Sequence, residues 1–402
     1  MGMHAIPDEL LELILLRLGS LIFLLRAASA CKRWRRIVAG ARFLGRFQFL
    51  HGPAVAGVFR QTQPPLFSKP ARRQRPWPRP SFVPSRTHGD CRFSLDFLPD
   101  RDATRPWAWR IVDSRGSLLL LDRLDPNGEQ PLPFQDMVVC EPATRCYRRI
   151  SPCSNFREHV VNHVFLLDGD GDGDGGEVDG AVGMSNFKVL CVLYRDDYAA
   201  GRCYHHAGVL TPGKSRRKIE IKGEDVIFLG ATSSSVYWYI RGRTMLALDR
   251  SRSVELSSFV LPNTKDFDDH ISPLHLTVVA SRRDGEARIA LSKGGGNLKV
   301  FARINGSGEW ALEKNIQLTV VAQGLPGYSP WYFGKPAWIF HIEATPTIMV
   351  LPWESFSSWW FHLDVDTGKA ELETSSGVDT TYPCELPWPP VMRACTEFPL
   401  NI

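Results

Sequence analysis

The chain has 402 residues, of which 44% are hydrophobic and 11% aromatic, and it contains 33 Gly and 29 Pro. This composition supports a folded core and excludes collagen, a long coiled coil and a wholly disordered chain. The net charge of +5 conceals an asymmetry, because residues 1–89 carry 15 Lys and Arg against three acids and the remainder carries 33 against 40. A nucleic acid or an acidic protein could exploit the basic part, and a solvated basic face is the alternative.

The sequence also bears on location. Residues 10–25 are apolar but are interrupted by Arg17, so we expect no transmembrane helix and no membrane partner. Asp8 and Glu9 precede this stretch, where a secretory signal would carry basic residues. Nine cysteines without a Cys-x-x-Cys pair favour reduced thiols. We therefore expect a cytoplasmic or nuclear protein.

The first fifty residues have helical periodicity. Pro7 suits a first helical turn, and apolar residues follow at steps of three and four, namely Leu10, Leu13, Ile14 and Leu18. We predict a first helix over 7–17, a second over 21–30, a short third, and a fourth that ends near residue 51. Because so small a unit buries little of its surface, we expect a partner to cover some of its apolar side chains.

From Ala54 onward, short apolar or alternating runs are separated by Gly, Pro, Asn and Asp, which is typical of an all-β fold. We expect no helix among them. The predicted strands are 110–112, 118–121, 137–141, 146–150, 189–194, 206–210, 226–229, 236–241, 245–249, 255–261, 276–280, 288–292, 298–303, 310–316, 338–342, 347–351 and 359–365.

A weak internal repeat indicates how these strands are arranged. Residues 139–145, 248–253 and 363–369 each end an apolar strand at an acid and then turn through Ser, Thr or Gly. Such repetition suits a radial array with roughly 40 to 50 residues per blade. A two-sheet sandwich is the alternative, although the stretch is long for one sandwich. We predict an α+β multidomain chain, with a small all-α domain at 4–51 and a mainly-β, propeller-like domain of about six blades at 54–399.

Two segments interrupt the strand pattern, and we expect both to be loops. Residues 61–86 are rich in Pro and Arg, and residues 167–180 are an Asp/Gly tract. Trp77 and Phe82 alternate with arginines, which would suit a nucleic acid, but no nucleic-acid-binding fold accompanies them. The Asp/Gly tract copies the start of a calcium loop, but position twelve is Asp179 and no helices flank it. We expect neither ligand.

Motifs for metal binding and catalysis are weak. His159 and His163 could hold zinc only on a helix, and their apolar neighbours favour a strand, while His205 and His206 would point to opposite sides of a strand. A Gly-x-Ser-x-Gly elbow, a phosphate-binding loop and a His-Glu-x-x-His helix are all missing from the sequence. We expect no metal, no cofactor and no enzymatic activity. Tryptophans gather at 331, 338, 353, 359, 360 and 388, and we interpret them as blade core rather than as a recognition face.

The N-terminal helices resemble the F-box. The residues that carry the similarity are Ile6-Pro7-Asp8-Glu9-Leu10-Leu11, Leu13-Ile14, Leu18, Leu24, Ala27-Ala28, Cys31-Lys32-Arg33-Trp34-Arg35 and Ile37. Residues 43–53 look like the extension found in large plant F-box families, some of which have a C-terminal β-propeller. The chain departs from the usual pattern in its opening Ile6 and in the apolar residues 21–23 after Gly19 and Ser20, where F-box sequences usually have a polar or acidic loop, and these residues either add contacts or weaken the interaction.

The resemblance implies a substrate adaptor of an SCF-type cullin-RING ubiquitin ligase. The helices would bind a Skp-type adaptor, and through it a cullin, and the β domain would hold an unknown target protein. The implied adaptor-binding residues are Ile6, Pro7, Leu10, Leu13, Ile14, Leu18, Leu24, Ala27, Cys31 and Trp34, whereas Leu11, Leu15 and Ile37 are expected to face inward. Three alternatives remain: an F-box protein outside ubiquitination, a non-ligase β-propeller scaffold that binds nucleic acid or a ligand through its basic loop, and a hidden hydrolase.

Overall fold

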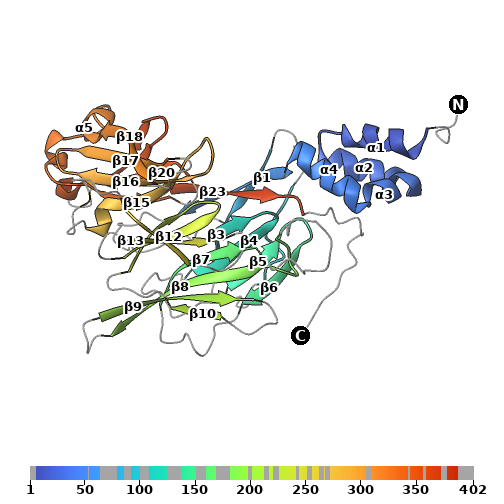
Figure 1. Cartoon of the computed structure of the whole chain (residues 1–402), viewed down its shortest axis with the longest axis horizontal. Helices are drawn as coiled ribbons and strands as arrows, with labels where there is room; N and C mark the ends of the chain where they lie inside the picture. Colours follow the sequence, from blue (N-terminus) through green and yellow to red (C-terminus); the bar gives the residue numbers. More distant parts are fainter. Residues whose placement is uncertain are drawn as a thin grey trace.

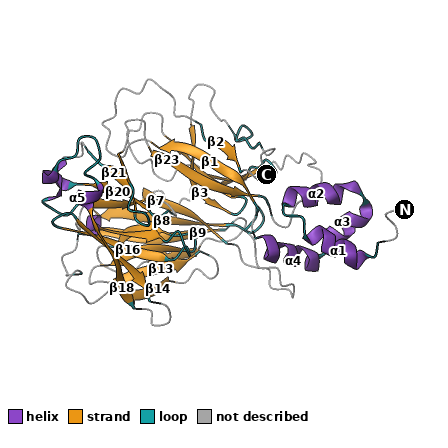
Figure 2. Ribbon diagram, turned by 90° about the horizontal axis from the view of Figure 1, so that it is seen from above, coloured by secondary structure: helices purple, strands orange, loops and turns teal. Residues whose placement is uncertain are grey.

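The computed structural model describes residues 6–52, 54–63, 79–85, 92–99, 108–124, 137–150, 160–168, 182–197, 202–211, 217–220, 226–240, 244–250, 256–261, 267, 272–304, 309–342, 345–355, 359–372 and 378–387. A bundle of helices comes first and a β domain follows. Figure 1 shows the helices at one end of the molecule, and Figure 2 shows the same separation from above.

The four N-terminal helices are α1 (Asp8–Leu16), α2 (Leu21–Ala30), α3 (Lys32–Val38) and α4 (Ala41–His51), close to the predicted ranges. Their buried side chains form one small core, which consists of Leu15, Leu16, Leu21, Leu24, Ala28, Val38, Phe43 and Phe47. The imidazole Nε2 of His51 lies 2.7 Å from the carbonyl oxygen of Leu16, which joins the ends of α4 and α1. Ala54 and Leu386 pack against the same core and connect it to the β domain.

The described strands of the β domain form six antiparallel sheets, so the predicted fold class is confirmed and the sandwich is excluded. Sheet 1 contains β1 (Val55–Gln63), β2 (Ser81–Pro84) and β23 (Val378–Glu385). Sheet 2 contains β3 (Ala108–Arg115), β4 (Leu118–Leu124), β5 (Met137–Glu141) and β6 (Cys146–Ile150). Sheet 3 contains β7 (Val160–Leu167), β8 (Lys188–Asp197), β9 (Arg202–Leu210) and β10 (Arg217–Glu220).

The remaining three sheets have the same up-and-down order as sheets 2 and 3. Sheet 4 contains β11 (Ile227–Ala231), β12 (Ser235–Ile240), β13 (Thr244–Asp249) and β14 (Leu256–Val260). Sheet 5 contains β15 (Leu276–Ala280), β16 (Ala287–Lys293), β17 (Asn297–Arg303) and β18 (Trp310–Gln317). Sheet 6 contains β19 (Trp338–His341), β20 (Thr347–Leu351), β21 (Phe361–Asp364) and β22 (Ala370–Leu372). The three acid-ended repeats each follow the third strand of a sheet.

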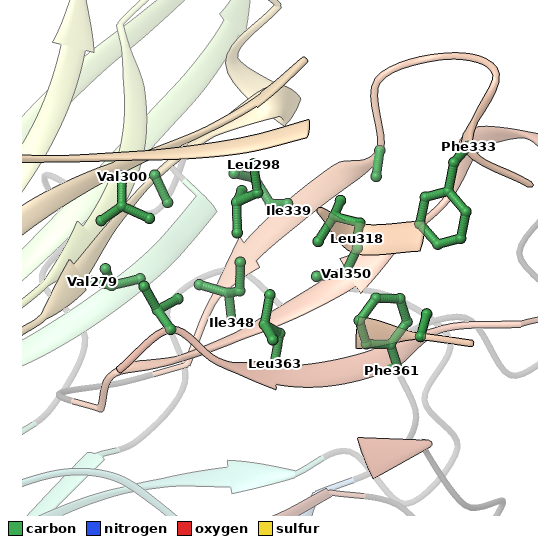
Figure 3. Packing of buried hydrophobic residues seen from close by; sticks show 14 of the residues in the cluster. Val279, Leu298, Val300, Leu318, Phe333, Ile339, Ile348, Val350, Phe361 and Leu363 are labelled. Atoms are coloured by element: carbon green, nitrogen blue, oxygen red, sulfur yellow. The ribbon is translucent and has the colours of Figure 1, made fainter. Parts of the chain in front are cut away.

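Apolar clusters lie between consecutive sheets, which is the packing that a propeller-like fold requires. One cluster joins sheets 1 and 2 through Phe59 and Ile111, and another joins sheets 2 and 3 through Leu120 and Val189. Further clusters lie between sheets 3 and 4, sheets 4 and 5, and sheets 5 and 6. Figure 3 shows the last of these, in which side chains from both sheets point toward one another.

Pairing at the domain ends explains three strands that local sequence pattern does not reveal. β1 pairs with β23 over eight residue pairs, from Val55 with Glu385 to Gln63 with Val378, although the two are more than 300 positions apart. β2 then pairs with the other edge of β1. Residues 64–78 and 86 of the predicted Pro/Arg loop lie outside the described residues, and the loop prediction is wrong for 61–63, which belong to β1, and for 81–84, which form β2. Residues 169–180 of the Asp/Gly tract also lie outside.

The expectation of no helix among the strands is wrong. The short helix α5 (Leu318–Val321) and the 3-10 helices η4 (Pro273–His275), η5 (Pro330–Phe333) and η6 (Trp353–Ser355) lie between strands. The outermost strands β10 and β22 are short and were also not predicted. Gly295 and Gly296 form the hairpin turn between β16 and β17 with φ near +70°. Such backbone favours glycine because it lacks a Cβ.

Strand direction divides the turns between two faces. The N–H of Glu385 donates to Gly116 O at 3.1 Å, so the β3–β4 turn lies at the end of β23 that adjoins the helices. Turns after the first and third strands of the four-stranded sheets share this side, and we call residues 116–117, 142–145, 232–234, 281–286 and 365–369 the near face. The opposite strand ends form the far face, residues 272–275, 294–296, 318–337 and 352–355. Figure 1 shows α5 of the far face at the end opposite the helices.

Candidate functional site

Helix α1 is apolar on two faces. Leu11 and Leu15 are buried, whereas Leu10, Leu13 and Ile14 are 53%, 48% and 53% exposed with the whole chain in place. At 100° per residue the three exposed side chains share one face of the helix, which we call the α1 stripe. A single exposed leucine is ordinary, but three on one helix face mark an interaction site. No other described part of the chain covers this stripe.

Covering the α1 stripe would be energetically favourable. Complete burial of a Leu or Ile side chain contributes about 1.5 to 3 kcal/mol. Since each of these three side chains is about half exposed, covering the rest contributes on the order of 1 kcal/mol each, or about 3 kcal/mol for the stripe. This is enough to anchor a partner around a few residues.

The charges beside the stripe are of both signs. Asp8 accepts from Arg33 Nε at 2.7 Å and pairs with Arg36 at 3.3 Å, and the hydrogen bond from Arg33 lowers the pKa of this exposed carboxyl. Glu12 forms an ion pair with Arg46. Glu9 and Arg17 are exposed at the two ends of the stripe. A partner with charged groups of both signs around an apolar centre would suit this surface.

The other predicted adaptor-binding residues fall into two groups. Pro7 and Cys31 are exposed, and Ile6 is half-buried. Half-buried residues that also pack against the helical core are Leu18, Ala27 and Trp34. The Asp8–Arg33 pair holds the start of α1 beside α3, which carries Trp34. Ile6 and the start of α1 therefore lie beside the first turn of α3, whereas Leu18 follows the other end of α1.

Leu24 is a correction to the predicted site. It is 0% exposed and belongs to the core that α2 shares with α1, α3 and α4. Leu24 matches the F-box pattern because it fills the core of the helical unit, and it does not lie on a contact surface. Of the residues expected to face inward, Leu11 and Leu15 are buried, and Ile37 packs partly buried against the core.

Sequence reasoning missed several exposed apolar residues of the helices. Leu21 is buried, so residue 21 belongs to the core, whereas Phe23 is 52% exposed with the Arg26 guanidinium 5.9 Å from its ring centroid. Phe49 and Leu50 are exposed on the last turn of α4. Phe43 and Phe47 are four residues apart and share the inward face of α4. Helical periodicity places Phe49 and Leu50 away from that face, and this could have identified them as exposed.

Ion pairs and hydrogen bonds connect neighbouring sheets on the near-face side of the β domain. Arg250 is 4% exposed and pairs with Asp113 of β3, and it also donates to the carbonyl oxygens of Leu166 and Thr232 at 3.0 to 3.2 Å. These contacts join sheets 2, 3 and 4. Burial raises the pKa of Asp113, and the Arg250 guanidinium opposes this rise. Arg115 donates to both Asp168 carboxylate oxygens at 2.6 and 2.7 Å.

The far face has different chemistry. Its exposed apolar side chains are Leu274 on η4, Val320 on α5, Trp331 on η5 and Trp353 on η6. The expectation that the C-terminal tryptophans fill the core holds for Trp359, which is buried, but is wrong for Trp331 and Trp353. Trp388 lies outside the described residues.

Within the part of the chain that the structure describes, neither a metal-binding cluster nor the buried cysteines indicate a further functional site. No group of three His, Cys, Asp or Glu residues there could hold a metal ion. His163 stacks on Phe228 with ring centroids 3.8 Å apart, and His159 lies outside the description. Burial raises the pKa of Cys140 and Cys191, which disfavours their thiolates. No helix in the described part of the chain is long and apolar enough to cross a membrane.

Comparison with solved structures finds remote similarity. HIRA(644–1017) matches at 10% identity with a TM-score of 0.24, covering 53% of each chain. BBS1N in complex with ARL6DN matches at 10% identity with a TM-score of 0.27, covering 64% of each chain. BamB from Moraxella catarrhalis matches at 11% identity with a TM-score of 0.25, covering 65% of this chain and 62% of that one. The match thus spans less than two thirds of each of these three structures.

Comparison with protein families gives a direct result for the helices. No curated protein matches the sequence. Residues 3–46 match the F-box-like family, and this range includes α1, α2, α3 and the first part of α4, together with the whole α1 stripe. The predicted resemblance is confirmed for the helical unit, while the plant origin stays a prediction. Residues 3–46 therefore form an F-box-like domain, and a mainly-β, propeller-like domain follows it.

Proposed function

We propose that this protein is the substrate-recognition subunit of an SCF-type ubiquitin ligase. The F-box helices bind a Skp-type adaptor, and through it a cullin, and the β domain holds a target protein. Ubiquitin transfer accelerates because the target is kept close to the conjugating enzyme, which raises its effective concentration. The protein contributes binding and position, with no chemistry of its own.

The exposed α1 stripe carries this proposal. Leu10, Leu13 and Ile14 stay about half exposed in the presence of the β domain, within the segment that matches the F-box-like family. If sheets of the β domain enclosed these side chains, they would need no partner. Their exposure, together with the half-buried Trp34 on the neighbouring helix α3, supports a protein interface that combines aliphatic residues with an aromatic one.

Co-expression of the full chain with a Skp-type adaptor and a cullin tests the proposal. We expect all three to co-purify. Replacing the stripe by Leu10→Ser, Leu13→Ser and Ile14→Ser together should weaken adaptor binding about 100-fold, because about 3 kcal/mol of apolar burial is lost. Leu312→Ser on β18 is the matched control, since Leu312 is 50% exposed but lies in the β domain. Equal adaptor recovery from the two variants would contradict the proposal.

The same experiment separates the rival functions. Recovery of the adaptor without the cullin would support an F-box protein that acts outside ubiquitination. Failure to recover either would leave the β domain as a scaffold for another ligand. For the nucleic-acid alternative, Arg72, Arg73 and Arg75 lie outside the described residues, and salt-sensitive binding to DNA or RNA would be its measurement. The cytoplasmic or nuclear location stays a prediction.

A further inference from the structure

An exposed aromatic surface lies on the far face over sheets 5 and 6. Trp331 on η5 is 81% exposed, Val320 on α5 is 65% exposed, and Trp353 on η6 is 46% exposed. α5 contacts η5, and η5 contacts η6, so these side chains come from adjoining elements. We call Lys293, Val320, Trp331, Lys335 and Trp353 the Trp331 platform.

The chain beneath the platform is firmly packed. Leu318 and Phe333 are buried in the cluster between sheets 5 and 6, where Figure 3 shows both side chains. The indole N–H of Trp359 donates to Pro326 O at 2.9 Å. Gly327 has φ of +77°, and a Cβ there would lie 3.3 Å from the Trp359 ring. Exposure of Trp331 is therefore not the result of a loose loop, and a preorganised aromatic side chain loses little entropy on binding.

The charges of the platform select its occupant. Lys335 is the only charged residue in 318–337, and its Nζ lies 5.9 Å from the centroid of the Trp353 ring. Lys293 adjoins the 294–296 turn, whose Gly296 O accepts from Leu318 N at 2.7 Å. Within the described ranges, neither lysine has a carboxylate at ion-pair distance. Glu354 on η6 adds one carboxylate here, with its oxygens 3.2 and 3.3 Å from the position of a Cβ on Gly334. Two lysines against this one acid leave the platform net positive, whereas residues 90–402 as a whole hold 33 basic against 40 acidic residues.

We propose that the Trp331 platform is the docking site for the target, and that it takes a protein segment with a Phe, Leu or Trp side chain between Asp or Glu residues. The apolar side chain packs on Trp331 and Val320, and the carboxylates pair with Lys335 and Lys293. This inference rests on the proposed function, because it assumes that the β domain holds the target.

The placement of the platform suits this role. In both Figure 1 and Figure 2, α5 lies at the end of the β domain opposite the four helices. A target on the platform and an adaptor on the α1 stripe can therefore be bound at the same time. Several charged groups of the near-face turns, by comparison, take part in ion pairs within the chain, such as Asp366 with Arg288.

An array of synthetic 12-residue peptides tests the proposal on the full chain. Each peptide carries one central Phe, Leu or Trp flanked by Asp and Glu, by Ser, or by Lys, and soluble copies are measured by fluorescence anisotropy. We expect the acidic class to bind at least tenfold more tightly than the lysine class. Trp331→Ala should weaken acidic-peptide binding at least tenfold, and Lys293→Glu with Lys335→Glu should reverse the charge preference.

Phe49→Ala is the matched control, because Phe49 is an aromatic residue that is 89% exposed at the other end of the molecule. It should leave peptide affinity unchanged. No preference for the acidic class, or equal affinity in Trp331→Ala, would overturn the proposal. So would a dimer of the full chain that Trp331→Ala converts to monomer, because a second copy would then cover the platform. Adaptor co-purification is measured in parallel, so failure of the docking site is distinguished from failure of the proposed ligase function.

Discussion

The F-box helices and the β domain treat their apolar side chains differently. The helices have one small core and leave the α1 stripe open to solvent, whereas the β domain places its large apolar side chains in clusters between consecutive sheets. A unit of about fifty residues has too much surface for its volume, so part of its apolar surface stays available. The helical unit therefore leaves much of its apolar surface for a partner, whereas the β domain buries most of its own between sheets and exposes a smaller share, such as Trp331.

The two parts also differ in how their charges are used. In the β domain, Arg250 is buried and contacts residues of three sheets. On the helices, Arg17 stays without a carboxylate partner among the residues described. Internal ion pairs fix the geometry of a fold, while unpaired surface charges guide association. The following predictions test this difference, from the largest expected effect to the smallest.

Replacing Arg250 with Met should have the largest effect on stability. It leaves the Asp113 carboxylate buried without its guanidinium, which costs about 3 to 5 kcal/mol of unfolding free energy. The matched control is Arg282→Met, whose ion pair with Asp364 is solvent-exposed on the arginine side and contributes below about 1 kcal/mol. Urea unfolding measures both. Equal losses would show that the buried pair does not hold the near face together.

Replacing Leu24 with Ala should destabilise the helices by about 2 to 5 kcal/mol, because it leaves a cavity in their core. Hydrogen exchange of the α1 to α4 amides reports this loss separately from the β domain. Leu13→Ala on the α1 stripe should change stability by no more than about 0.5 kcal/mol, since its side chain is exposed. If the two variants lost equal stability, the division into core and stripe would be wrong.

Replacing Gly296 with Ala should cost about 1 to 2 kcal/mol, since an L-residue is strained in the left-handed region. Gly296 has φ of +71°, and a Cβ would lie 2.9 Å from Thr319 Cγ2. Gly294→Ala in the same turn is the control, because no atom lies within 4 Å of its Cβ position. Thermal unfolding and peptide binding to the Trp331 platform measure the effect. A neutral Gly296→Ala would show that the platform is less rigid than its packing indicates.

Cysteine alkylation should distinguish the two parts without altering stability. Cys31 on the helical side and Cys146 on the β domain are exposed and should react with iodoacetamide, while Cys140 and Cys191, whose pKa is raised by burial, should not. Adding the Skp-type adaptor should slow alkylation of Cys31 alone. Mass spectrometry gives both rates, and unchanged reactivity of Cys31 in the complex would remove it from the proposed interface.

Local sequence pattern was sufficient to predict an element whose structure is determined by its own residues. The spacing of apolar residues by three and four around Leu10 indicated a helix, and α1 is present there. It failed for β1 and β23, because β1 is rich in polar residues and β23 contains Pro383. These segments become strands by pairing with each other, which no window of neighbouring residues records.

For the candidate site too, some features were predictable from the sequence and others were not. Periodicity identified α1 as amphipathic, but it could not tell which of its two apolar faces is buried, nor that Leu24 is core. The exposure of Trp331 was likewise unpredictable, because tryptophans in a β domain serve either in a core or on a surface, and the choice depends on the packing of Phe333 and Trp359 beneath it.

The sequence by itself determined the F-box helices, the repeated strand-and-turn units and the imbalance of charge, because each depends on residues close together in the chain. Tertiary structure decided the pairing of β1 with β23, the separation of near and far faces, and which apolar side chains stay exposed. The physical reason is that burial is a property of what packs on a residue, and the packing residues come from segments far away in the sequence.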